Sequence, residues 1–94
     1  GAISDYTKAI EINPQYSKAY YNRGWSKSQL GDYYGAISDY TKTIEIDPTN
    51  KSAFKNRGID KKKTGDLKGA CSDWRQTLSL SPSDAAAKWI KEDC

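Results

Sequence analysis

Histidine, methionine and valine are absent from this chain of 94 residues, and phenylalanine occurs only once. Without histidine, imidazole acid–base catalysis, histidine-ligated metal sites and a pH switch near neutrality are excluded. The sequence also has no glycine-rich phosphate loop and no nucleophile grouped with a base. We therefore expect a protein that is not an enzyme and that holds no metal ion and no cofactor.

Cysteine is almost as scarce, with only Cys71 and Cys94 in the chain. Two cysteines are too few for a disulfide scaffold or a four-thiolate zinc site, and we interpret both as reduced thiols. The longest uncharged stretches fall well short of the roughly 18 residues that a membrane span needs. We expect a soluble protein without a membrane segment and favour a cytoplasmic location.

Aliphatic residues are few, since Ile, Leu and Phe together number 13 of 94 residues. Seven Tyr and three Trp supply the missing apolar area. A domain of this size buries only about two-thirds of the surface that its unfolded chain exposes. The sequence therefore predicts a thin, aromatic core.

The chain repeats itself with a period of 34 residues. Residues 1–16 match residues 35–50 at 12 of 16 positions, and residues 17–50 match residues 51–84 at 13 of 34 positions. Two consecutive matches at one offset indicate a repeat architecture.

Within one unit the apolar residues recur at helical spacing, as Ala36, Ile37, Tyr40 and Ile44 show. Gly-Asp pairs favour the end of one helix and the cap of the next, and a residue before proline is disfavoured in helical geometry. No segment alternates as a strand does, so we expect none. The predicted helices lie near residues 1–12, 18–30, 33–46, 52–64, 67–80 and 84–92.

Six positions carry the same kind of residue in both full units, in the order aromatic, Gly, Gly, Ala, aromatic and Pro. They are Tyr20, Gly24, Gly31, Ala36, Tyr40 and Pro48 in the first, and Phe54, Gly58, Gly65, Ala70, Trp74 and Pro82 in the second. A 34-residue unit with this pattern resembles the tetratricopeptide repeat. The resemblance implies an all-α fold, a right-handed α-solenoid of about two and a half helix-turn-helix repeats in one domain of residues 1–94. Residues 1–16 would be the second helix of a partial repeat, 17–50 and 51–84 full repeats, and 85–94 a C-terminal capping helix.

One departure from the family pattern concerns charge. The family usually has Leu at the seventh position of the unit, and this chain has Arg23 and Arg57 there, each followed 16 residues later by Asp39 or Asp73. A semi-buried guanidinium needs a carboxylate, and an Arg–Asp pair can be bidentate. We expect these residues to pair within or between repeats. The alternative is that the Arg head groups are solvated and only their stems are packed.

For four further residues the sequence gives expectations about packing. Asp60 lies inside an otherwise helical segment and is followed by three lysines, which weakens the packing of the second unit. Cys71 takes the place of Ile37 in the repeat, so we expect a small buried residue rather than a reactive thiol. Trp89 and Ile90 should pack back onto the last repeat as a cap.

In this family the first helix of each repeat lines the concave side of the superhelix, where peptides dock. The resemblance and the helical spacing thus predict a protein-interaction module with a peptide-binding face. Aromatic, amide and basic side chains on this face can bind an apolar anchor, a backbone and carboxylates, so we expect a protein or peptide partner and favour an acidic one. The residues assigned to the face are Lys18, Tyr21, Asn22, Trp25, Ser28 and Gln29, and Ser52, Lys55, Asn56, Ile59, Lys62 and Lys63.

The best-known specific site of the family, the carboxylate clamp of chaperone adaptors, is not expected. It needs Lys and Asn on one first helix, Asn on the next and two basic residues on a third. Asn56 matches the middle element, but Tyr21 and Trp25 stand where the first Lys and Asn would be. Ala86 and Ile90 stand where the third helix should be basic.

Two alternative functions come from other features of the sequence. Residues 51–68 hold seven basic and two acidic residues, which would attract a phosphate backbone. Consecutive lysines on a helix point about 100° apart, however, so we disfavour nucleic-acid binding. The other alternative is self-association, because the helix near residues 1–12 lacks a pairing helix and its apolar face, Ile3, Tyr6 and Ile10, is uncovered.

Overall fold

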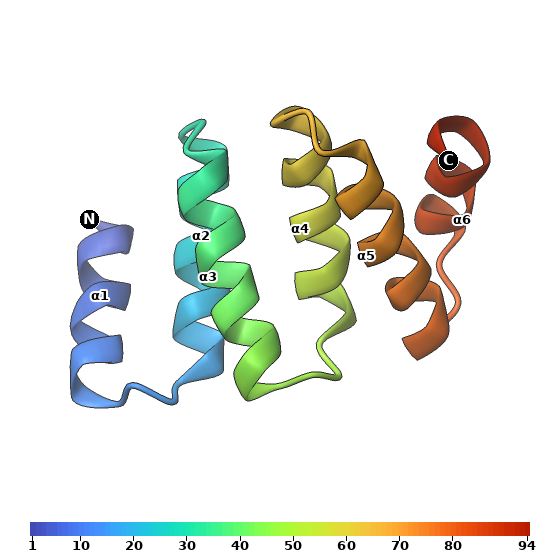
Figure 1. Ribbon diagram of the computed structural model, residues 1–94. Coiled ribbons are helices and arrows are strands. Elements are labelled where there is room, and N and C mark those ends of the chain that lie inside the picture. Colours follow the sequence, from blue (N-terminus) through green and yellow to red (C-terminus); the bar gives the residue numbers. More distant parts are fainter.

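The structure, a computed structural model, describes residues 1–94 as six α-helices without a strand (Figure 1). Each helix begins and ends within one residue of the bounds predicted from the sequence, and the all-α fold is confirmed. None of the helices has the length and apolar character needed to cross a lipid bilayer. The helices are α1 (Ala2–Ile12), α2 (Ser17–Gln29), α3 (Tyr33–Ile46), α4 (Lys51–Lys63), α5 (Leu67–Leu80) and α6 (Asp84–Asp93).

Short polar side chains and two glycines define the helix ends. Asp32 and Asp66 cap α3 and α5, each accepting a hydrogen bond from the backbone N–H three residues later, and Asn50 caps α4 in the same way. Gly31 and Gly65 have φ angles of 85° and 93°, in the left-handed region that residues with a side chain rarely adopt. The Gly-Asp pair therefore turns the chain from the first helix of each repeat into the second.

The six helices stand side by side in a row (Figure 1). The largest contacts join α2 to α3 and α4 to α5, and further contacts join α1 to α2, α3 to α4 and α5 to α6. We call α2, α4 and α6 the A helices and α1, α3 and α5 the B helices. Because α2 also contacts α4 directly, the A helices form the more closely packed side of the row, here called the A side.

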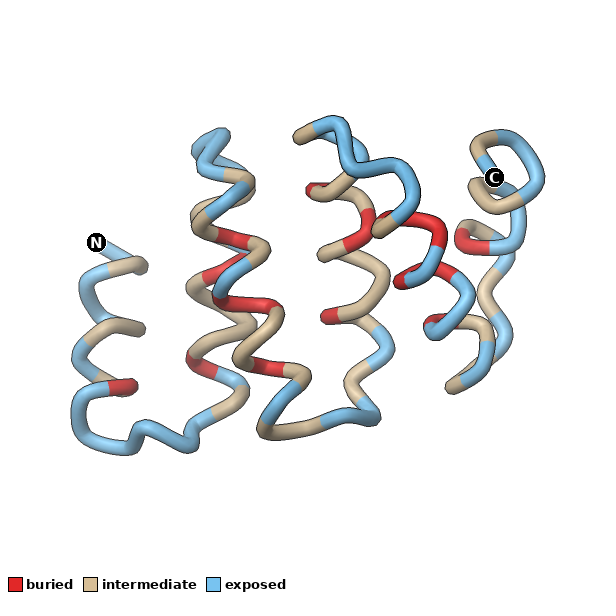
Figure 2. The backbone as a smooth tube through the Cα atoms, viewed as in Figure 1, coloured by how far each residue is buried: buried red, intermediate tan, exposed pale blue.

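The core consists of two small clusters, one in the middle of the row and one at its C-terminal end (Figure 2). One joins α3 to α4 and the other joins α5 to α6. Glycine permits the close approach within each repeat, because a Cβ atom on Gly58 would lie 2.5 Å from Nε1 of Trp74. The fully buried members of the two clusters are Ala36, Tyr40 and Ala53, and Ala70, Trp74 and Ala86.

Helix α6 covers the C-terminal end of the row. The ring of Trp89 lies 5.3 Å from that of Trp74, and Ile90 packs against the same cluster. On the outer side of α6, Lys91 and Glu92 are exposed. An amphipathic helix with a polar outer face is typical of the ends of repeat arrays.

Cys71 and Cys94 form a disulfide bond, so the expectation of reduced thiols is wrong. Cys71 is buried in α5, as its place in the repeat predicted, and Cys94 follows α6 at the surface. The fold of α6 against α5 brings together two residues that are 23 positions apart, with their Cα atoms at 6.0 Å.

Reduction of this disulfide is expected to lower the free energy of unfolding by about 3 kcal/mol, because the cross-link restricts the unfolded chain. Urea unfolding of the wild type with and without a phosphine reductant measures the difference. The Cys94→Ser variant serves as the control, since its stability should equal that of the reduced wild type and should not respond to reductant. Equal stability of the oxidised and reduced wild type would contradict the prediction.

Candidate functional site

Two buried Arg–Asp pairs join the A and B helices of the full repeats. Nε and Nη2 of Arg23 donate to the two carboxylate oxygens of Asp39 at 2.9 and 2.7 Å. Arg57 makes the same two bonds to Asp73, at 2.8 and 2.6 Å. Both Asp side chains are only 4% exposed, so the bidentate geometry offsets the loss of their hydration. The predicted pairing is confirmed, and it lies within each repeat.

Each Arg also reaches the preceding repeat. Nη1 of Arg23 donates to Oγ1 of Thr7 on α1 at 3.3 Å, and Nη1 of Arg57 donates to Oγ1 of Thr41 on α3 at 3.2 Å. The Arg side chains therefore link three helices each. The third B helix, α5, has the exposed Arg75 at the repeat position of Thr7 and Thr41. An arginine side chain cannot accept a hydrogen bond.

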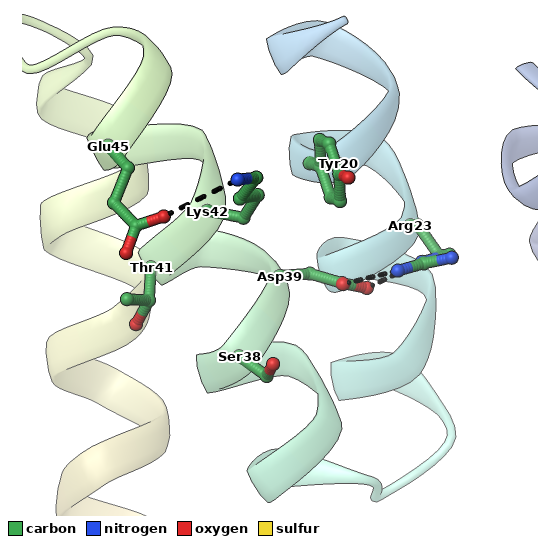
Figure 3. A pocket seen from close by; sticks show the side chains of 7 residues that line it. All are labelled: Tyr20, Arg23, Ser38, Asp39, Thr41, Lys42 and Glu45. Carbon is green, nitrogen blue, oxygen red and sulfur yellow. Dashed lines mark hydrogen bonds and ion pairs between the residues drawn. The ribbon is translucent and has the colours of Figure 1, made fainter. Parts of the chain in front are cut away.

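A polar cavity of about 360 Å³ lies beside the first pair, and Figure 3 shows the side chains of Arg23 and Asp39 meeting at its edge. Lys27 lies 3.3 Å from the same carboxylate, and the hydrogen bond to Asp39 raises the pKa of Arg23. The remaining charged groups of the cavity, Lys42 and Glu45, are 3.7 Å apart. Each charged group that lines this cavity lies within 4 Å of a group of opposite charge.

The predicted concave-face residues line more than one cavity. In the centre, Nδ2 of Asn56 donates to the hydroxyl of Tyr21 at 2.9 Å, and the Tyr21 ring lies 5.7 Å from that of Tyr40. Tyr21 and Asn56 thus hold α2 against α4. Asn22, the repeat equivalent of Asn56, has no such partner because the structure has no A helix before α2.

Asp60 is a buried carboxylate between α2 and α4. The hydroxyl of Ser28 donates to its Oδ1 at 2.9 Å, but its Oδ2 has no hydrogen-bond partner. Burial raises the pKa of Asp60, against the opposing effects of Ser28 and of the charge on Lys63. Burial also raises the pKa of the Tyr40 phenol, and the charge of Asp60 adds to this effect. The carboxylate of Asp60 is therefore incompletely compensated by hydrogen bonds.

An apolar cavity of about 380 Å³ lies between α4, α5 and α6. At its edge, Nζ of Lys62 lies 2.7 Å from Oδ2 of Asp93. The sequence assigned three of the lining residues to the binding face but assigned Trp74 and Trp89 only to packing. A tryptophan with one face on the core and another on a cavity gives no separate signal in the sequence. The lining residues are Ile59, Lys62, Lys63, Trp74 and Trp89.

Trp25 and Gln29 lie at the other end of the A side. Trp25 is 51% exposed, and both residues line a cavity of about 620 Å³ together with Leu30 and residues 1–4. The structure therefore brings Trp25 and Gln29 together and Ile59 and Lys62 together, but it places the two groups in different cavities.

The remaining residues of the predicted face have different surroundings. Lys18 is exposed, whereas Ser52 and Lys55 are half-buried beside a polar cavity of about 130 Å³. Nζ of Lys63 lies 4.9 Å from the ring centre of Tyr33, in a cation–π contact between α4 and α3.

Comparison with known proteins agrees with the period and the helix pairs. The family profile described as tetratricopeptide repeat matches residues 17–50. The structure of the TPR domain of Arabidopsis OM64 superposes with a TM-score of 0.87 at 31% sequence identity, covering 96% of this chain and 74% of that one. This chain belongs to the tetratricopeptide repeat (TPR) family.

Two other solved structures share the TPR fold. The first TPR of Spaghetti (RPAP3), bound to an HSP90 peptide SRMEEVD, gives a TM-score of 0.91 at 23% identity and covers 96% of this chain and 72% of that one. The crystal structure of MamA gives 0.81 at 29% identity, covering 83% of this chain and 46% of that one. A comparison with curated protein sequences found no significant match.

The TPR repeats should depend on their Arg–Asp pairs for stability. The Arg57→Ala variant is expected to lose about 3 kcal/mol of unfolding free energy, because Asp73 stays buried with its bidentate partner removed. Chemical unfolding followed by circular dichroism measures the loss. The control is Arg75→Ala on the exposed side of α5, which should change the stability by less than about 0.5 kcal/mol. Similar small losses in both variants would contradict the role of the pair.

The buried Asp60 should affect how stability depends on pH. Because its pKa is raised in the folded state, the folded protein binds the proton more tightly than the unfolded chain does. The wild type should therefore gain stability relative to Asp60→Asn as the pH falls from neutrality toward the ordinary aspartate value of 3.8. Urea unfolding of both proteins at several pH values isolates this contribution. A difference that stays constant with pH would show that Asp60 titrates as an exposed carboxylate does.

Proposed function

We propose that this TPR domain is a protein-interaction module that binds a peptide on the A side, along α2, α4 and α6. The cavity between α4 and α6 carries the proposal, because Ile59, Trp74 and Trp89 give it an apolar floor. Its volume of about 380 Å³ falls in the range of binding pockets, and it suits one large apolar side chain. Its walls are packed against the core, so little side-chain ordering is needed on binding.

Positive charge around this cavity favours an acidic peptide. Lys62 and Lys63 stand at its edge, and Lys55 lies two turns earlier on α4. The carboxylate of Asp93 pairs with Lys62 in a partly exposed contact. Such an ion pair contributes little and exchanges readily for a peptide carboxylate. The lysines would act mainly by steering an acidic segment toward the apolar cavity.

The peptide bound by the first TPR of Spaghetti, SRMEEVD, combines an apolar residue with several acidic ones. That complex supports the idea that a TPR fold of this size can hold such a segment. This chain would hold it differently, because Tyr21 and Trp25 occupy the positions of a carboxylate clamp on α2. We propose the cavity at Ile59 as the main anchor site, with Trp25 as a second aromatic contact and Asn22 as a donor to the peptide backbone.

The basic segment at residues 51–68 gives less support to nucleic-acid binding than its composition suggested. Arg57 and Lys61 both contact the carboxylate of Asp73, and Lys62 contacts that of Asp93. Three of the seven basic side chains are thus neutralised by carboxylates within the chain. Affinity for a phosphate backbone depends on the number of free positive charges, so we prefer a peptide ligand.

Peptides selected from a random phage-displayed library are expected to be acidic and to contain a large apolar residue. Their affinity for the Ile59→Glu variant should fall by about 30-fold or more, because a carboxylate would enter the cavity beside an acidic ligand. The Lys55→Ala variant should bind with a weaker salt dependence. Fluorescence anisotropy with the labelled peptides measures both effects.

The matched control is Lys68→Ala, which removes the same charge from the exposed surface of a B helix and should leave the affinity unchanged. The peptide SRMEEVD serves as a reference and should bind more weakly than the selected peptides, since the clamp residues are absent. Circular dichroism checks that each variant is folded. Unchanged binding of the selected peptides to Ile59→Glu would place the site elsewhere on the domain.

A further inference from the structure

A cavity of about 330 Å³ lies beside the disulfide bond between α5 and α6. Cys71 and Cys94 both line it, together with Leu67, Lys68, Arg75 and Asp93. The cavity shares no lining residue with the one at Ile59. A small molecule bound in it would therefore contact the disulfide without occupying the peptide site on the A side.

Two basic side chains of this cavity have no acidic partner. Lys68 and Arg75 are both exposed, and neither takes part in any ion pair of the chain. The carboxylate of Asp93, which also lines the cavity, lies 2.7 Å from Nζ of Lys62, whose charge offsets its own. The cavity therefore attracts anions.

Both cations stand on the same face of α5 as Cys71. Lys68 lies three residues before Cys71 and Arg75 four residues after it, the spacings at which side chains of a helix adjoin. Neighbouring Lys or Arg side chains stabilise the thiolate form of a cysteine. Thiol–disulfide exchange is faster when the departing sulfur leaves as a stabilised thiolate. The arrangement of charges thus favours Cys71 as the leaving group.

The other sulfur is the one open to attack. Cys94 is exposed, whereas Cys71 is only 5% exposed. Because exchange depends on access to the attacked sulfur, an incoming thiolate reaches Cys94 more readily than Cys71. Attack at Cys94 and departure of Cys71 are therefore the matched halves of one reaction.

We propose that this cavity is the docking site of a low-molecular-weight thiol with two carboxylate groups, which exchanges with the disulfide and thereby controls peptide binding on the A side. The two carboxylates of the thiol pair with Lys68 and Arg75. Leu67, which is 41% exposed, contacts its apolar part. The volume of about 330 Å³ falls at the lower end of the range of small-molecule sites.

The exchange proceeds in two balanced steps. The thiolate of a first molecule attacks Sγ of Cys94, the S–S bond breaks, and its electron pair goes to Sγ of Cys71. This step leaves a mixed disulfide on Cys94 and a thiolate on Cys71. A second thiol molecule then attacks the sulfur of the first, which frees Cys94 and releases the two small molecules as their own disulfide. The protein gains two electrons and two protons, which the two thiols lose.

Opening the disulfide removes the covalent link between α6 and the rest of the row. Helix α6 packs mainly on α5 and carries Trp89, which lines the cavity at Ile59. The disulfide fixes the chain to α5 a few residues after Trp89. Exchange therefore loosens one wall of that cavity and lowers its affinity for a peptide. This last step rests on the proposed function.

Thiols of different charge test the docking site on the oxidised wild-type protein. The probes are mercaptosuccinate, which has two carboxylates, uncharged 2-mercaptoethanol and cationic cysteamine. Acid quenching and mass spectrometry give each exchange rate, which is divided by the rate of the same thiol with an uncharged cystine derivative. We expect the relative rate of mercaptosuccinate to exceed that of 2-mercaptoethanol by about 10-fold or more, cysteamine to be slowest, and the first mixed disulfide to lie on Cys94.

Charge removal tests the two cations. The Arg75→Ala and Lys68→Ala variants should each slow mercaptosuccinate at least about three-fold more than they slow 2-mercaptoethanol. The matched control is Lys8→Ala, which removes the same charge from the exposed surface of α1 and should leave both rates unchanged. Equal relative rates of the three thiols, an equal effect of Arg75→Ala on both thiols, or a first mixed disulfide on Cys71 would overturn the docking site.

The selected peptides measure the effect on the A side. Wild-type protein opened by exchange should bind them about 10-fold more weakly than the oxidised protein, and the indole N–H signal of Trp89 should shift in NMR spectra. Reoxidation should restore both, which requires no variant. Cys94→Ser should bind as the opened protein does, whether or not mercaptosuccinate is present.

Equal peptide affinity of the opened and oxidised proteins would overturn the control of the A side by the thiol. Failure of the proposed function gives a different result. In that case Ile59→Glu would bind the selected peptides as the wild type does, while the charge dependence of the exchange rates and the shift of Trp89 would remain.

Discussion

The buried Arg–Asp pair is the interaction on which the rest of this structure depends. Each carboxylate lies beneath an A helix, where little water can replace a lost partner, and so requires the guanidinium of the same repeat. A further N–H group of the guanidinium, on Nη1, donates to a threonine of the preceding B helix. A single arginine side chain thus joins the two helices of its own repeat and also links that repeat to the preceding B helix. In a chain without valine or methionine, this hydrogen bonding supplements a small apolar core.

Much of the fold could be predicted because its signals are local and occur more than once. The Gly-Asp pairs mark helix ends through backbone geometry and capping, which depend on a few neighbouring residues. The Arg–Asp pairing could be predicted because the separation of 16 residues recurs in the second repeat. The same separation in the second repeat supported the pairing predicted for the first. Tertiary contacts that recur with the 34-residue period could therefore be predicted from the sequence.

Features outside the period could not be predicted. Cys94 lies beyond the last full repeat and has no equivalent, so nothing in the pattern indicated that it would bond to Cys71. The binding face was predicted less well for a different reason. Helical spacing shows which residues share one side of a helix, but it does not show which of them bond to the next helix. The hydrogen bond between Tyr21 and Asn56 and the cavity beside Trp89 both depend on distances between helices.

Arg75 makes the C-terminal end of the array chemically different from the contacts between its repeats. Each joint between repeats has an arginine on the A helix and a threonine on the preceding B helix, but α5 offers Arg75 instead. An A helix of the usual kind would set two guanidinium groups against each other here, and α6 has instead the exposed Lys91 at this position. A repeat added before α1 would reuse the Arg–Thr hydrogen bond that links the existing repeats. A repeat added after α5 would need a different contact at this position.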